Sequence, residues 1–532
     1  MNNSVNGKAF LSRPGRLTVW IVLWFAVWLT GCTSVNPKVP RPITQTFISY
    51  GSTPLRDWTD SLSLASGESA FHLVSTGRDA LSARLALIDQ AVNSIDMQYY
   101  MVRDDSSTQL LIHHLLLAAD RGVRIRLLVD DIYGLKRDYI LATLSAHPRI
   151  EIRVFNPFLA RGKVNPLRIL EFFQKSSLNK RMHNKLLVVD NAALIVGGRN
   201  LGNEYFDSEA ATEFTDLDVL VLGPVVFQAS LSFDEYWNHQ LAIPVRAFLR
   251  EMPTEEHLEV MRFRLQKLMM SLQDNDYQAQ FSKNPLGQGI ARHQLTLSHG
   301  RARMLYDRPE KIMSEAKGLF KGVHMAAELY PVLDKTREDT LLISAYFVPG
   351  PRLRERLAAL VTRGVRVRVL TNSLAATDVA YVHGGYSRWR GELIRSGVEL
   401  YEMRPLKRRP VASFHLIGSS QSSLHAKAMI MDAQRVFIGS MNLDQRSIYL
   451  NTETGILIDS PELVKELRAS FERMMLPDRS YQVYANPDEP GRLLWWGAPA
   501  GKSEVLHRDP EAGFWKRWQA AFLGKIIPEK ML

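Results

Sequence analysis

The chain has 532 residues and 46% hydrophobic content, so it is long enough for a large core or for two domains. Lysine and arginine exceed aspartate and glutamate by 11, which favours an anionic partner, either a phospholipid surface or a nucleic acid. The single cysteine excludes an intrachain disulfide, and no cluster of cysteine and histidine residues along the sequence would complete a metal site.

Residues 1–32 are predicted to be an export signal. Basic residues precede an apolar run, 17–29, that is too short to cross a bilayer comfortably. The run leads to Leu29-Thr-Gly-Cys32, which resembles the signal of a bacterial lipoprotein, cleaved before the cysteine and lipidated on it. An uncleaved N-terminal anchor is the alternative. Residues 33–34 lack the aspartate associated with inner-membrane retention, so this resemblance favours the outer membrane, facing the periplasm, over the inner membrane.

The remainder of the chain is predicted to form two similar halves. Residues 33–70 carry proline, serine and threonine without periodicity, as is typical of a tether. The predicted order after the tether is a first lobe, a connecting helical segment, a second lobe and an aromatic and basic tail: 71–250, 251–300, 301–480 and 481–532.

The repeated unit is a strand, a helix and a second strand with alternating arginines. In the first half the strands are Ser94–Tyr100 and Arg121–Asp130, and in the second they are Thr340–Phe347 and Arg363–Thr371. Strands that alternate with helices predict α/β lobes with a mostly parallel core, mixed where hairpins join. The alternating arginines are expected to be solvated charges at strand edges.

Each half also contains one copy of a polar motif on a predicted hairpin. The motif places His, Lys, Asp and Asn at relative positions 0, 2, 7 and 17, and these are His183, Lys185, Asp190 and Asn200 in the first copy and His425, Lys427, Asp432 and Asn442 in the second. The hairpins return to Gly197-Gly198 and to Gly439-Ser440. One such pattern is weak, but two copies that also agree in the glycine and asparagine are not a coincidence.

Residues two apart on a strand point to the same face, so each motif histidine projects together with its lysine. The hairpin turn brings the asparagine back toward the start of the same strand. The two copies together supply two imidazoles, two ammonium groups and two amides, which suits a phosphodiester. A lone histidine on an apolar strand is usually a core residue, but two complete copies favour catalysis. No metal is expected, because a lysine stands where a second ligand would be needed.

The duplicated motif resembles the phospholipase D superfamily. The segments 300–311 and 346–350 and the tail are similar to bacterial cardiolipin synthases of the C-type. This resemblance implies two pseudo-symmetric lobes with a shared active site at their interface, working without a cofactor. It also implies phosphatidyl transfer through a phosphohistidine. We assign His183 as nucleophile and His425 as acid and then base, a choice that the pseudo-symmetry of the sequence leaves open.

The resemblance also implies roles for neighbouring residues. Asp216–Pro224 aligns with Glu453–Pro461 without a gap, and in the family an acid here bonds the catalytic imidazole. Asp216 and Glu453 are therefore expected in that role, with Asp218 as the alternative to Asp216. The expected ligands of the phosphoryl oxygens are Lys185, Lys427, Asn200, Asn442 and Ser440, and the expected structural residues are Asp190, Asp432, Gly197, Gly198 and Gly439.

The expected substrates are phosphatidylglycerol and phosphatidylethanolamine at a membrane surface, with no nucleic acid. Hydrolysis to phosphatidic acid is the first alternative, and a nuclease of the same superfamily is the second. The tail interleaves aromatic and basic residues over Phe514–Lys525, which suits either a membrane interface or a helix that caps the core. Phe158–Phe173 is a candidate lid or lipid contact, and His383 is either a substrate contact or an ordinary surface residue. The sequence does not fix the acceptor or the oligomeric state.

Overall fold

The structure is a computed structural model. It describes residues 35–36, 38–47, 51–132, 138–158, 176–206, 216–249, 251–274, 277–314, 319–320, 322–405 and 423–531. Cys32 and almost all of the candidate lid Phe158–Phe173 lie outside these residues.

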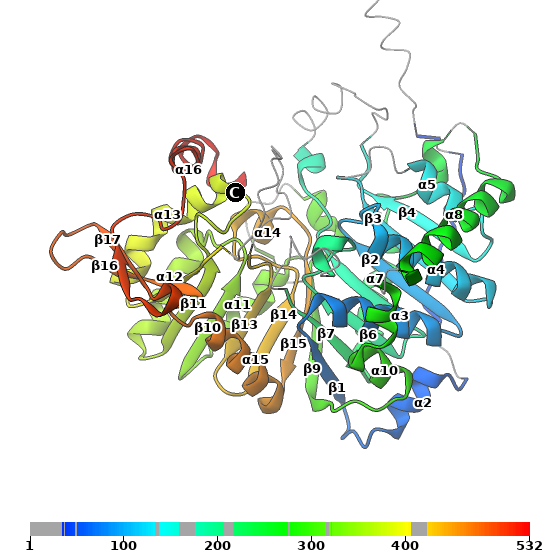
Figure 1. The fold of residues 1–532 in the computed structure, drawn as a ribbon, viewed down its shortest axis with the longest axis horizontal. Helices are drawn as coiled ribbons and strands as arrows, with labels where there is room; N and C mark the ends of the chain where they lie inside the picture. Colours follow the sequence, from blue (N-terminus) through cyan, green and yellow to red (C-terminus); the bar gives the residue numbers. More distant parts are fainter. Residues whose placement is uncertain are drawn as a thin grey trace, which may run out of the picture.

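One continuous sheet runs through both halves of the chain (Figure 1). In spatial order its strands are β8 (Ala242–Pro244), β4 (Ile150–Phe155), β3 (Arg124–Asp130), β2 (Ser94–Tyr99), β5 (Lys185–Val189), β6 (Ala193–Gly197), β7 (Asp218–Leu222), β1 (Glu68–Val74), β9 (Ser298–Tyr306), β15 (Thr454–Asp459), β14 (Arg435–Gly439), β13 (Lys427–Met431), β10 (Asp339–Ser344), β11 (Arg366–Asn372), β12 (Glu399–Met403), β16 (Ser480–Ala485), β17 (Leu493–Gly497) and β18 (Glu504–Leu506).

The two lobes meet where β1 pairs with β9, in the middle of this sheet. The strand register repeats from one lobe to the other, since Tyr99 stands opposite Lys185 and Ser344 stands opposite Lys427. Among the strands that the structure describes, parallel pairing is confined to β2–β3–β4 in the first lobe and β10–β11–β12 in the second, apart from isolated parallel bridges. The predicted mostly parallel core is therefore wrong in its proportion, because the motif hairpins and the strands that join the lobes are antiparallel.

Helices cover the sheet, and they are α2 (Pro54–Ser61), α3 (Gly77–Gln90), α4 (Ser106–Asp120), α5 (Asp138–Leu144), α7 (Val225–Trp237), α8 (Glu255–Asp274), α9 (Tyr277–Ser282), α10 (Pro285–Ala291), α11 (Met325–Leu333), α12 (Gly350–Thr362), α13 (Ala380–Arg395), α14 (Gln445–Tyr449), α15 (Pro461–Met474) and α16 (Phe514–Ile526). Side chains cap the N-termini of several of these helices. Thr76 accepts from Asp79 N at the start of α3, and Asp105 accepts from Thr108 N at the start of α4. Among the described residues, no helix is both long and apolar enough to span a bilayer.

The central apolar cluster belongs to both lobes. It contains Val188 and Phe233 from the first lobe together with Ile430 and Phe471 from the second. Separate apolar clusters lie under α3 and α4 in the first lobe and under α11, α12 and α13 in the second. Because the central cluster buries side chains from both motif hairpins, the packing of the two lobes fixes the position of one motif relative to the other.

The segment 38–47 of the predicted tether lies against the first lobe. Buried arginines of β3 and β4 bind its backbone: Arg126 Nη1 donates to Thr44 O (3.0 Å) and Arg153 Nη2 donates to Pro42 O (2.7 Å). Arg126 is also paired with Asp96, with its Nε 2.7 Å from Oδ1. The expectation of solvated strand-edge charges is thus wrong for Arg126, which, like Arg153 of β4, binds an extended chain segment whose backbone needs donors.

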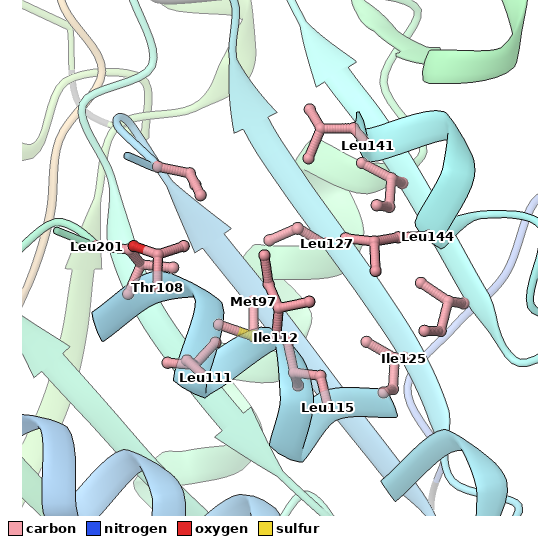
Figure 2. Close-up of a pocket in the computed structure, with 13 residues that line it drawn as sticks. Met97, Thr108, Leu111, Ile112, Leu115, Ile125, Leu127, Leu141, Leu144 and Leu201 are labelled. Atoms are coloured by element: carbon pink, nitrogen blue, oxygen red, sulfur yellow. The ribbon is translucent and has the colours of Figure 1, made fainter. Parts of the chain in front are cut away.

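A small cavity of about 20 Å³ remains in the first-lobe core, between α4, α5 and the strands β2, β3 and β4 (Figure 2). Its lining is apolar and includes Met97, Leu127 and Leu141. Thr108 is the polar exception, and its buried hydroxyl has no hydrogen-bond partner among the residues that the structure describes. The cavity contains none of the predicted site residues and belongs to the packing of the lobe.

Candidate active site

Each motif histidine lies two residues before the strand that begins with its lysine. Lys185 is the first residue of β5 and Lys427 is the first residue of β13. At the other end of each hairpin, the motif aspartate has a positive φ, 52° at Asp190 and 54° at Asp432. Asp190 accepts from Ser94 N (2.9 Å), and Asp432 accepts in the same way from Glu338 N (2.8 Å). These aspartates therefore tie the hairpin turn to the start of the neighbouring strand, as their predicted structural role requires.

The histidine–acid pairs cross between the lobes. His183 Nδ1 lies 2.8 Å from Glu453 Oε2, and His425 Nδ1 lies 2.6 Å from Asp216 Oδ2. An isolated β-bridge between Met182 and Thr452 supports the first contact, and in it His183 N donates to Thr452 O (2.8 Å). Each imidazole is thus oriented by an acid of the other lobe, so the two motifs form a single site at the lobe interface.

The structure distinguishes Asp216 from Asp218. Asp218 forms a buried ion pair with Arg84, Nη2 to Oδ2 at 2.9 Å, and lies 3.5 Å from Arg199 Nη1. Its charge is therefore balanced inside the first lobe. Asp216, two residues earlier, is the acid that contacts His425. Within a regular strand, residues two apart would share a face, but β7 begins at Asp218. Asp216 lies before the strand, so its carboxylate does not follow the alternation and points to a different partner.

The side chains of the two acids differ in length. The residue that faces each acid at the end of its hairpin differs accordingly, and it is glycine beside Asp216 and serine beside Glu453. A side chain at Gly198 would place its Cβ 2.2 Å from Asp216 Oδ1, so only glycine leaves room for this acid. At the equivalent position of the second copy, Ser440 Oγ donates to Glu453 Oε2 (2.5 Å) and accepts from Thr454 N (3.0 Å). Ser440 thus contacts the acid in this structure, and its expected contact with a phosphoryl oxygen stays a prediction.

The motif asparagines have different partners. Asn200 accepts from Met101 N (3.2 Å) and donates to the Tyr205 hydroxyl (3.0 Å). The Oδ1 atom of Asn442 is buried and has no hydrogen-bond partner within the described parts of the chain. The two copies are therefore equivalent in sequence but not in the hydrogen bonds they leave for a substrate.

Two tyrosines at the site were missed by the sequence analysis. The Tyr100 ring packs edge-on against His183 at 4.9 Å between centroids, and the Tyr205 ring packs against His425 at 5.4 Å. Tyr100 follows the last residue of β2, and Tyr205 lies between Asn200 and Asp216, a stretch that is five residues longer than its counterpart between Asn442 and Glu453. Their place outside the repeated motif explains why spacing alone did not identify them.

Burial makes the charges of the site strongly interdependent. Burial, with the charges of Lys185 and Lys427, holds the pKa of His183 well below its usual value, and burial with Lys427 lowers the pKa of His425 to about 4. Burial likewise lowers the pKa of Lys427 to about 8 and that of Lys185 well below its ordinary range. A bound phosphodiester anion would offset these shifts, because negative charge favours protonated lysine and histidine.

The two acids are not equivalent electrostatically. Burial raises the pKa of Glu453 to about 7, although Lys185 and Ser440 oppose this shift. Burial would also raise the pKa of Asp216, but the charges of His425, Lys427 and Arg199 lower it below its usual value. Asp216 is therefore the firmly ionised acid of the pair, and the imidazolium form is better stabilised at His425 than at His183.

His383 lies outside this constellation. It is buried beside Arg390 and Asp509, with His383 Nε2 3.4 Å from Asp509 Oδ1. His383, Glu402 and Asp509 are close enough to hold a metal, and this is the one such group among the described residues. Arg390 already binds both acids, at 2.9 Å from Glu402 and 2.7 Å from Asp509. Its guanidinium supplies the positive charge that an ion would bring. His383 is buried and is therefore not a surface residue, and a contact with substrate stays a prediction.

The chain is similar to known proteins over most of its length. Residues 85–228 and 329–475 match the family described as "Cardiolipin synthase, PLD-like domain". The chain is 38% identical to cardiolipin synthase C of Escherichia coli K12 over 467 residues, which cover 85% of this chain and 94% of that protein. It is 33% identical to an uncharacterized protein of Helicobacter pylori 26695 over 529 residues, covering 97% and 100% of the two chains.

A solved structure supports the fold independently. The phosphatidylserine synthase of Haemophilus influenzae Rd KW20 superposes with a TM-score of 0.53 at 12% sequence identity, covering 87% of this chain and 95% of that one. The duplicated lobes and the shared site define a phospholipase D-type enzyme. The chain belongs to the cardiolipin synthase family of such enzymes. The predicted family and the predicted α/β fold with two phospholipase D-type lobes are confirmed, and both matched segments lie within the predicted lobes 71–250 and 301–480.

Proposed function

We propose that this cardiolipin synthase-like enzyme transfers a phosphatidyl group from one phospholipid to the hydroxyl of another and so forms cardiolipin. The observation that supports this most is the crossed pairing of His183 with Glu453 and His425 with Asp216, with both motif lysines at the same site. Phosphatidylglycerol is the proposed acceptor, and either phosphatidylglycerol or phosphatidylethanolamine is the proposed donor.

His183 is proposed to be the nucleophile. Because its Nδ1 faces a carboxylate, the neutral ring carries its hydrogen there and keeps the Nε2 lone pair for phosphorus. Its lowered pKa keeps the ring neutral at pH 7. Nε2 attacks phosphorus, the bond to the head-group oxygen breaks, and a phosphohistidine forms.

His425 is proposed to be the acid and then the base. The ionised Asp216 stabilises its imidazolium form, and a bound phosphodiester raises its affinity for a proton further. It donates this proton to the departing alkoxide and takes a proton from the acceptor hydroxyl in the second step, as the P–N bond breaks. Lys185, Lys427, Asn200 and Asn442 stabilise the phosphoryl oxygens during both displacements.

Hydrolysis is the main competing outcome, because water and a lipid alcohol compete for the same phosphohistidine. Transfer prevails only where water is excluded and the acceptor is held close to phosphorus. The test is mass spectrometry of the products formed by purified full-length protein on phosphatidylglycerol vesicles, with and without phosphatidylethanolamine. Cardiolipin is the expected main product. Phosphatidic acid without cardiolipin would replace transfer by hydrolysis.

Two controls belong to that experiment. His183→Ala and His425→Ala should each lower turnover by at least about a thousandfold with little further loss in the double variant, since the histidines act as a unit. Exhaustive chelation should leave the wild-type rate unchanged, because lysines and amides take the place of a metal. Activity on single-stranded nucleic acid, assayed in parallel, would instead favour the nuclease alternative.

We further propose that the mature protein begins at a lipidated Cys32 and faces the periplasm, with the outer membrane favoured over the inner. The support is the lipoprotein-like stretch Leu29–Cys32. Cys32→Ser should prevent acylation and leave an unprocessed chain in intact-mass measurements. A wild-type protein that retains Met1 would contradict this proposal, and fractionation of the two membranes would decide the location.

A further inference from the structure

The last helix of the chain is fixed against the second lobe by a face of small residues. Figure 1 shows α16 beside α13. A Cβ on Gly384 of α13 would lie 2.1 Å from the carbonyl oxygen of Ala520, and one on Gly524 would lie 2.8 Å from the Cα of Gly384. The two backbones are thus in direct contact. α16 cannot turn about its own axis without losing this contact, so its outward face is determined.

The outward face of α16 is aromatic. Its exposed side chains, with the exposed fraction of each residue, are Phe514 (71%), Trp515 (72%), Trp518 (46%), Phe522 (48%) and Ile526 (61%). The spacing of four residues from Phe514 through Trp518 to Phe522 places these rings on one side of the helix. The rings of Trp518 and Phe522 stack at 4.9 Å between centroids. A continuous exposed surface of large aromatics on a folded protein marks a site of interaction.

The charge of the helix indicates the chemistry of the partner. Between Phe514 and Ile526 the sequence contains Lys516, Arg517 and Lys525 and no acidic residue. Lys525 is exposed, next to the aromatic face. Tryptophan and phenylalanine combined with cations match the interface of a bilayer, where rings lie at the level of the head groups and cations meet anionic phosphates.

The helix is also bonded to a loop beside the active site. Lys516 Nζ donates to Ala375 O (3.0 Å) and to Thr377 O (2.7 Å). The next residue, Asp378, is half-buried, accepts from the Tyr346 hydroxyl (2.8 Å), and lies close enough to Lys427 for its charge to favour the ammonium form. Any external surface that binds the exposed face of α16 is therefore held close to the part of the active site that contains Lys427.

We propose that the aromatic face of α16 docks the enzyme on a phospholipid bilayer with anionic head groups and so presents the active site to its lipid substrates. This inference rests on the proposed transfer between phospholipids and adds the surface through which the protein meets them. Docking at this position also supplies the exclusion of water that transfer requires, since the bilayer covers the surroundings of the site.

The first test is spectroscopic and independent of turnover. Trp518→Cys in the full-length protein is labelled with a polarity-sensitive fluorophore, and the equally labelled parent, whose one cysteine is Cys32, gives the background. Phe263→Cys on α8, where the native side chain is 57% exposed, is the matched control. With phosphatidylglycerol vesicles, emission from position 518 should shift to the blue and be quenched by brominated lipid, whereas position 263 should not change.

Two results of that test would overturn docking. One is the absence of a shift at position 518. The other is a label at 518 that is already shielded before vesicles are added, because the face is then covered by a second copy or by the chain itself. Measuring the protein at several concentrations distinguishes shielding by a second copy from shielding by the chain itself, since only shielding by a second copy depends on concentration.

The second test separates docking from chemistry. The triple variant Trp515→Ser, Trp518→Ser and Phe522→Ser should lose at least about tenfold in turnover of vesicle lipids. It should keep the wild-type rate on a short-chain phospholipid dissolved below its micelle concentration, and the same unfolding midpoint. Equal loss on both substrates would show a structural role for the helix and overturn the proposal. A wild-type protein inactive on both substrates would instead refute the proposed function, and the label would still decide docking.

Discussion

At the scale of single residues, the site depends on contacts between distant parts of the chain, because Glu453 orients His183 and Asp216 orients His425. The shared spacing placed His183, Lys185, His425 and Lys427 in one constellation, and the gapless alignment singled out Asp216 and Glu453. It did not show which acid faces which histidine. His183 and Glu453 are 270 residues apart, and their contact depends on the packing of the two lobes, which local periodicity does not encode.

The unequal acids lead to a prediction that distinguishes the two histidines. If His425 protonates the leaving alkoxide, a substrate with a good leaving group needs no acid in the first step. A phosphodiester in which nitrophenol replaces the head-group alcohol is such a substrate. His425→Ala and Asp216→Asn should then regain most of the first-step burst on this substrate. His183→Ala and Glu453→Gln should not, because the nucleophile and its orienting acid are still required.

The measurement is the nitrophenol burst in stopped-flow experiments, with the natural lipid as the comparison substrate for each variant. Rescue of the His183 variant and not of the His425 variant would reverse the assignment of nucleophile and acid. Rescue of neither would show that both histidines are needed to reach the phosphohistidine.

At the scale of elements, periodic segments were predicted well and non-periodic ones were not. The connecting helical segment predicted over 251–300 contains α8, Glu255–Asp274, because apolar side chains recur at helical spacing there. The segment 38–47 has no periodicity, and it was interpreted as a tether although Arg126 and Arg153 bind it through backbone carbonyls. Contacts to the backbone leave no pattern in the sequence of the segment that is bound.

Helix α4 offers a test of how the first lobe is packed. The Thr108 hydroxyl is buried at the cavity of Figure 2 without a partner, so Thr108→Val keeps the shape and removes an unsatisfied polar group. We expect this variant to be more stable by about 1 kcal/mol, since burying an unpaired hydroxyl is costly. The midpoint of thermal or denaturant unfolding measures the change.

The matched control for this prediction is Thr143→Val on the neighbouring helix α5. The Thr143 hydroxyl is also in the core region, but it donates to Tyr139 O at 2.7 Å. Its removal costs a hydrogen bond and should not stabilise the protein. Equal effects of the two substitutions would mean that the Thr108 hydroxyl is satisfied in solution, for instance by a water molecule.

At the scale of the whole molecule, the duplication produces one site instead of two. Each lobe contributes a histidine, a lysine and an acid, but the acid of each lobe serves the histidine of the other. The lobes also share the central apolar cluster and one continuous sheet. A chain with a damaged motif in either lobe is therefore expected to lack the whole site and not half of the activity.

This architecture predicts the outcome of mixing two inactive proteins. His183→Ala and His425→Ala each leave one intact motif, and in a mixture both intact motifs are present on different chains. Because the crossed pairs form within one chain, around a core that already buries both hairpins, the intact motifs have no means of meeting. The mixture should therefore form no cardiolipin above the level of either variant alone, whatever the oligomeric state, when assayed on phosphatidylglycerol vesicles. Recovery of activity that rises with protein concentration would show that the site is assembled between chains.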